Sequence, residues 1–148
     1  MTVFNKFLLL ALLVALSIPA PKAEHLVIAA VNDTHSQITP AADNKGGLLR
    51  RRAIYDQIRR ENKNTMIIHG GDAVQGTLYF SLFKGEVEFA AIDSIGYDMV
   101  TFGNHEFDGD LSVLKNQMKM SDFQWISANI VTGNGKPLAA PYYIKDFD

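Results

Sequence analysis

The chain has 148 residues, of which 47% are hydrophobic and 20% are charged, so it is long enough to bury the core of one globular domain. Its formal net charge of -2 argues against binding to a nucleic-acid duplex through bulk positive charge. Because the chain contains no cysteine, it can form neither disulfide bonds nor a lipid anchor on a cysteine.

The first 23 residues have the layout of a secretory leader. Lys6 precedes the apolar run FLLLALLVALSI at positions 7–18, and small residues follow it. This run is shorter than the roughly 20 residues that span a bilayer, so we expect no membrane span once the leader is removed. Cleavage after Ala20 and cleavage after Ala23 both fit, and the alternative to a leader is a buried N-terminal helix. We therefore expect residues 24–148 to be periplasmic or extracellular.

Strands and helices alternate along the rest of the chain. Apolar, β-branched runs predict strands within 25–31, 64–72, 97–106 and 123–130, with a fifth at 142–147. Helical spacing predicts helices at 48–61, at 86–96 after a break near Lys84-Gly85, and at 111–120. This alternation predicts an α/β fold with a mostly parallel sheet and crossover helices.

Hydrophobic spacing also predicts which side chains are buried. In the helix at 48–61, Leu49 and Ile54 are expected on a buried stripe, and the arginines at 50–52 are expected to face solvent. Trp125 is expected in the core. Asp110 is the expected N-cap of the helix at 111–120.

Polar side chains follow three of the predicted strands where each strand ends. Asp33 and His35 follow the first, Asp72 the second, and Asn104 and His105 the third. In a parallel sheet the carboxyl ends of the strands meet at one edge, so these groups are expected to converge. Carboxylate, imidazole and amide groups suit divalent metals, and one carboxylate can bridge two ions. The alternatives are a polar turn and, for Asp72, a helix N-cap.

Two carboxylates accompany His105. Asp108 lies three residues on, so within a helical turn it can orient the imidazole and stabilise its charge. Glu106 is expected to hold a loop or a ligand in place. His69 is interpreted as a structural residue at a strand end, with support of a metal ligand as the alternative.

The ordered motifs NDTHS at 32–36, GGDAVQGT at 70–77 and GYDMVTFGNHEFD at 96–108 resemble the calcineurin-like metallophosphoesterases. More narrowly, they resemble the secreted 5′-nucleotidase and UDP-sugar hydrolase group of that family. The resemblance covers residues 26 to about 146. It implies an α/β sandwich and a hydrolase that cleaves nucleotides or other small phosphate esters with two divalent metal ions, which can be Zn, Mn, Co or Mg.

The resemblance also implies roles for individual residues. Asp33 and His35 would hold one metal, Asp72 would bridge both metals, and Asn104 would bind the second. His105 and Asp108 would form the catalytic dyad, with His105 contacting the phosphate. Gly109 stands one position earlier than is usual in the family, which leaves open the aim of Asp108.

The family pattern includes ligands that this sequence does not contain. It has three further histidines, two of them in a G-H-x-H motif, and a second domain that binds the base. We therefore interpret residues 24–148 as the N-terminal part of a truncated metallophosphoesterase domain. Alone, it is expected to bind metal weakly and to have little or no phosphatase activity. The alternative is a non-catalytic secreted module that binds metal or nucleotide.

Overall fold

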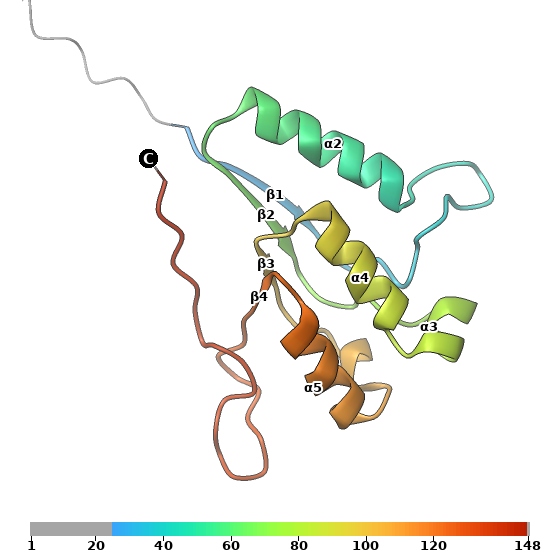
Figure 1. Cartoon of the computed structure of the whole chain (residues 1–148), viewed down its shortest axis with the longest axis vertical. Helices are drawn as coiled ribbons and strands as arrows, with labels where there is room; N and C mark the ends of the chain where they lie inside the picture. Colours follow the sequence, from blue (N-terminus) through green and yellow to red (C-terminus); the bar gives the residue numbers. More distant parts are fainter. Residues whose placement is uncertain (1–24, 148) are drawn as a thin grey trace, which may run out of the picture.

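The protein forms one four-stranded sheet in the order β1-β2-β3-β4, and every neighbouring pair of strands is parallel (Figure 1). The strands are β1 (Val27–Val31), β2 (Thr65–His69), β3 (Met99–Val100) and β4 (Gln124–Trp125). This computed structural model describes residues 25–147, so the predicted leader at 1–23 lies outside the described residues. The predicted α/β fold with a parallel sheet is confirmed.

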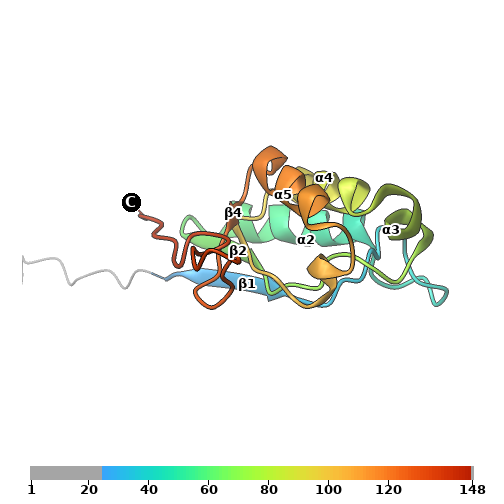
Figure 2. The same cartoon turned by 90° about the horizontal axis from the view of Figure 1, so that it is seen from below.

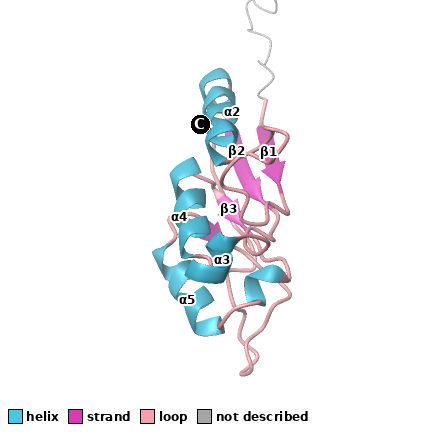
Figure 3. Ribbon diagram, turned by 90° about the vertical axis from the view of Figure 1, so that its right-hand side faces the viewer, coloured by secondary structure: helices cyan, strands magenta, loops and turns pink. Residues whose placement is uncertain are grey.

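Helices connect the consecutive strands. They are α2 (Leu48–Glu61), α3 (Leu78–Phe83), α4 (Glu86–Ile95) and α5 (Leu111–Met120). Figures 2 and 3 show α2, α4 and α5 on the same side of the sheet. Within residues 25–147, no helix has the length and apolar character needed to cross a membrane.

Residues at the helix ends set where α3, α4 and α5 begin and end. Lys84 and Gly85 have positive φ angles of 53° and 96°, which separate α3 from α4 where the break was predicted. Asp110 caps α5 as predicted, because its Oδ1 accepts a hydrogen bond from Ser112 N at 2.6 Å.

The core lies between the sheet and the helices. Ile67 and Val100 at the centre of the sheet are fully buried. Trp125 packs against three aromatic rings, with ring centroids 4.6 Å from Phe102 and 5.2 Å from both Phe89 and Phe123. The predicted core position of Trp125 is confirmed.

The buried face of α2 differs from the predicted one. Leu49 and Ile54 are 78% and 56% exposed, whereas Tyr55 is 6% exposed and Arg51 is half-buried. The helix docks through Tyr55, whose ring meets the ring of Tyr97 edge-on at 5.6 Å. The prediction that the arginines at 50–52 all face solvent is therefore wrong for Arg51, which turns toward the sheet.

The later strands are shorter than predicted. β3 and β4 each pair over two residues, and the segment at 142–147 forms no strand. An isolated bridge between Ile126 and Ala140 replaces a ladder at this side of the sheet. The C-terminal segment is instead held by Lys145, whose ammonium group pairs with Asp98 and donates to Thr65 O at 3.3 Å.

Candidate metal centre

The loops that follow β1 and β2 are joined by backbone hydrogen bonds beyond the ends of the strands. Asp33 N donates to Gly71 O and His35 N donates to Asp72 O, both at 3.0 Å. The parallel pairing of β1 with β2 therefore continues into the loops. As a result, Asp33, His35 and Asp72 lie together at the carboxyl edge of the sheet.

A compact cluster of possible metal ligands forms at this edge. His35, Asp72 and His105 can each offer one ligand atom, and these atoms lie within 4.8 Å of one another. The rings of His35 and His105 meet edge-on with centroids 5.1 Å apart. Asp33 Oδ1 lies 3.6 Å from His35 Nε2, so this carboxylate borders the cluster.

The η1 helix (His105–Phe107) turns the polar residues after β3 toward the cluster. His105 Nδ1 donates to Asp108 Oδ2 at 2.6 Å, and this hydrogen bond raises the pKa of His105 above its usual value. The earlier position of Gly109 therefore does not turn Asp108 away from His105. Asn104 precedes η1, is exposed, and makes no side-chain capping bond to that helix.

Two glycines allow the loops after β2 and β3 to touch. A Cβ added at Gly71 would lie 2.3 Å from Gly103 N, and one added at Gly103 would lie 2.0 Å from Asp72 Oδ1. Side chains at these positions would displace the carboxylate at the centre of the cluster. Asp72 is not a helix N-cap, because Thr77 caps the next helix, α3.

The backbone is strained where the candidate ligands sit. Asp33, His35 and Asp72 have positive φ angles of 53°, 43° and 53°, a region that non-glycine residues seldom adopt. Each such residue costs of order 1–3 kcal/mol, and surrounding contacts must hold it. Strain of this kind is concentrated at functional sites.

The donor set fits a divalent metal ion. Two imidazoles and a carboxylate converge, and all three side chains are only partly buried, so an ion can reach them. Imidazole and carboxylate ligands together suit Zn, Mn and Co, and carboxylates also suit Mg. Asn104 stands at the start of η1, next to His105 in the sequence.

Comparison with known proteins identifies the family of the chain. Residues 26–145 match the family model described as calcineurin-like phosphoesterase. The chain belongs to the calcineurin-like phosphoesterase family. It is 34% identical over 132 residues to a 5′-nucleotidase of Vibrio cholerae, a match that covers 86% of this chain and 24% of that protein. The family resemblance inferred from the motifs is confirmed.

Solved structures share the fold of this phosphoesterase chain. The structure of the Haemophilus influenzae NAD nucleotidase aligns with a TM-score of 0.73 and 31% identity, covering 83% of this chain and 24% of that one. A 5′-nucleotidase precursor from Thermus thermophilus aligns with a TM-score of 0.73 and 32% identity, covering 82% and 26%. The chain spans about a quarter of the length of these relatives.

His69, at the end of β2, connects the loop after β1 with the loop after β2. It is 1% exposed, and its Nδ1 accepts a hydrogen bond from Gly71 N at 3.1 Å. The neutral ring therefore carries its proton on Nε2, which donates to Thr34 Oγ1 at 2.9 Å. Thr34 lies between the two candidate ligands of the first loop, and Gly71 precedes Asp72. His69 is thus a buried strand-end residue that also ties the loops together.

Acid is expected to destabilise the protein partly through His69. Burial, reinforced by the charge of Arg51, lowers the pKa of His69 from 6.5 to about 4. Between these values the unfolded chain binds more protons than the folded one, so stability falls as the pH decreases from 6.5 toward 4. The full loss is roughly 3 kcal/mol. Urea denaturation at pH 7.5 and pH 4.5 measures most of this loss, which is complete only below the folded-state pKa.

The matched variant for this prediction is His69→Gln. Its amide can accept from Gly71 N and donate to Thr34 Oγ1, but it does not titrate. We expect its stability to fall less between the two pH values than that of the wild type. An equal fall in both proteins would show that His69 is not the group responsible.

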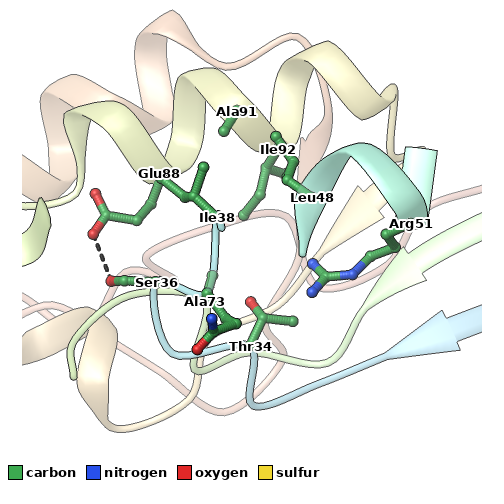
Figure 4. Close-up of a pocket in the computed structure, with 10 residues that line it drawn as sticks. Thr34, Ser36, Ile38, Leu48, Arg51, Ala73, Glu88, Ala91 and Ile92 are labelled. Carbon is green, nitrogen blue, oxygen red and sulfur yellow. Dashed lines mark hydrogen bonds between the residues drawn. The ribbon is translucent and has the colours of Figure 1, made fainter. Parts of the chain in front are cut away.

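A buried carboxylate, Glu88, lies behind the loop that follows β1 and was not predicted. Glu88 is 2% exposed and accepts a hydrogen bond from Ser36 Oγ (Figure 4). Its Oε2 has no hydrogen-bond partner among the described residues, and with Arg51 it lines a cavity of about 10 Å³. Such a cavity holds about one water molecule. The burial of Glu88 could have been predicted from helical spacing, because Glu88 shares a face of α4 with Ile92 and Ile95.

Proposed function

We propose that this chain carries the metal-binding loops and the catalytic dyad of an exported, metal-dependent phosphohydrolase that acts on nucleotides. The observation that carries the proposal is the convergence of three strand-end loops around Asp72, with the His105–Asp108 pair beside it. Family membership supports phosphoester hydrolysis. The substrate class is supported by the relatives, several of which are named 5′-nucleotidases.

The proposal assigns the metal ligands by position. Asp33, His35 and Asp72 would hold one divalent ion, and Asp72 and Asn104 would hold a second. Bound ions of this kind polarise phosphoryl oxygens and neutralise the charge that develops on them. The central place of Asp72 is supported by its contact with both neighbouring loops, through His35 N on one side and His105 N on the other.

His105 and Asp108 act on the substrate phosphate as a pair. Because Nδ1 of His105 donates to Asp108, the other ring nitrogen can contact the phosphate, so this proposal does not count His105 among the metal ligands. The hydrogen bond to Asp108 raises the pKa of His105, and a protonated ring can donate a hydrogen bond to a phosphate oxygen or to the leaving oxygen. Asp108 holds the ring in this orientation and keeps the proton on it.

The same proposal assigns a leader and one domain segment to the chain. Residues 1–23 are a leader that directs export, which their short apolar run supports. Residues 24–148 are the N-terminal part of a metallophosphoesterase domain. The ligand count supports this, because the four histidines of the sequence are fewer than the family resemblance requires of a two-metal centre with its dyad.

That ligand count also favours a second candidate function, a secreted module that binds metal or nucleotide without catalysis. Only His35 and His105 of the four histidines reach the cluster. The two functions differ in one outcome, which is whether bound nucleotide is cleaved.

One experiment separates the candidates. Purified chain is mixed with AMP and Mn²⁺, and nucleotide binding and phosphate release are both measured, with His105→Asn as the matched variant. The phosphohydrolase predicts Mn²⁺-dependent binding of AMP and slow phosphate release that His105→Asn abolishes. Binding without release supports the non-catalytic module. If the chain binds neither Mn²⁺ nor AMP, both candidates are overturned.

A further inference from the structure

Glu106 is a buried carboxylate in the middle of an exposed turn. The residue before it, His105, is half-buried and the residue after it, Phe107, is exposed, whereas Glu106 is 4% exposed. Glutamate is almost never buried this completely unless its charge is compensated. The groups that compensate the charge of Glu106 therefore indicate the role of this side chain.

Three backbone N–H groups surround this carboxylate. Glu106 Oε2 accepts from Asp72 N at 3.0 Å and from Gly103 N at 2.6 Å, and Oε1 accepts from Ala73 N at 2.7 Å. Within residues 25–147, Glu106 takes part in no salt bridge, so these amides are its compensating partners. Hydrogen bonds from N–H groups to a carboxylate are roughly twice as strong as neutral ones.

These contacts act on the residue at the centre of the cluster. Asp72 has a φ angle of 53°, a strained value that surrounding contacts must maintain. Glu106 binds the amide of Asp72 and the next amide in the chain. In return, Asp72 Oδ1 accepts from His105 N at 2.9 Å, so each loop holds the other through a carboxylate.

We propose that Glu106 is a positioning residue that fixes the Asp72 carboxylate and His105 in one geometry before any ligand binds. The inference rests on the proposed metal centre, but Glu106 itself does not touch the ions or the substrate. Its carboxylate takes the place of side-chain packing at a contact where Gly71 and Gly103 leave no side chains. At this contact the two loops are held by hydrogen bonds from backbone N–H groups to the Glu106 carboxylate.

The variant Glu106→Gln tests this role. Glutamine has the same shape, but its NH₂ group cannot accept a hydrogen bond, so at least one of the three amides loses its partner. We expect the Mn²⁺ affinity of the folded variant to fall by about 10- to 100-fold, the usual effect of removing a partner that orients metal ligands. Isothermal titration calorimetry of the full chain measures this affinity.

The matched control is Asp98→Asn. Asp98 also accepts a hydrogen bond from a backbone amide, Ile67 N at 2.7 Å, but it precedes β3 and so lies at the opposite end of the strand from the cluster. Both variants are expected to lower the thermal stability, and Asp98→Asn is expected to keep the wild-type Mn²⁺ affinity. Equal Mn²⁺ affinity in Glu106→Gln and wild type overturns the positioning role.

A second measurement needs no metal. In the metal-free wild-type chain, the amides of Asp72, Ala73 and Gly103 are expected to exchange slowly with deuterated solvent, although they lie in loops. Fast exchange of these amides overturns the positioning role even if Glu106→Gln does not fold. If the wild type binds no Mn²⁺ while the three amides are protected, the proposed metal centre is wrong. The role of Glu106 in holding the two loops together is then still supported.

Discussion

Replacing Gly103 with alanine is expected to abolish metal binding while the fold persists. An added Cβ would lie 2.0 Å from Asp72 Oδ1 and 2.7 Å from Asp72 N, so the carboxylate must move. Overpacking of this kind costs about 1–3 kcal/mol, which a folded domain can tolerate. Since the displaced group is the central ligand candidate, we expect the Mn²⁺ affinity to fall by at least about 100-fold. Isothermal titration calorimetry measures the affinity, and circular dichroism reports the fold.

Gly133→Ala is the matched control for this substitution. Gly133 has no atom within 4 Å of its added Cβ and has no positive φ angle, so alanine fits there without strain. This variant is expected to bind Mn²⁺ as the wild type does. Wild-type affinity in the Gly103 variant would mean that the loops after β2 and β3 do not meet at Asp72.

The variant Asp72→Asn is expected to lose metal-dependent stabilisation without losing the fold. Asparagine keeps an oxygen that can accept the hydrogen bond from His105 N, which is 2.9 Å long in the wild type. It lacks the negative charge and the second carboxylate oxygen. At free Mn²⁺ one hundred times the Kd, binding stabilises the wild type by about 2.7 kcal/mol. Urea denaturation with and without Mn²⁺ should show this gain in wild type and Asp98→Asn, but not in Asp72→Asn.

The helices could be predicted from the sequence because their signals are local. The bounds of α2 and α5 agree with the predicted ranges 48–61 and 111–120. Asp110 and the Lys84-Gly85 pair act within one turn of the boundaries that they set. The buried face of α2 was predicted less well, because it depends on Tyr97 and other residues that are distant in sequence.

Strand lengths could not be predicted, because pairing is decided by the neighbouring strand. The apolar run at 123–130 predicts a long strand, yet β4 pairs only over Gln124–Trp125. The segment at 142–147 has strand-like composition, but the Lys145 side chain, and not a backbone ladder, attaches it to the sheet. Composition alone does not distinguish these two forms of attachment.

The position of the candidate site followed from a single topological rule. Polar residues after parallel strands converge at the carboxyl edge, and His35, Asp72 and His105 do so. The contacts between the loops could not be predicted in the same way. The approach of Gly71 to Gly103 and the bond from His69 to Thr34 join residues more than 30 positions apart, and only the folded backbone shows them.

The most direct test of a metal centre built around Asp72 is to count the manganese bound to the folded chain. Wild type and Asp72→Asn are dialysed against the same free Mn²⁺ concentration, and the metal in each protein is measured by elemental analysis. We predict bound manganese in the wild type and little in the variant. Equal metal content in the two proteins would contradict a site centred on Asp72.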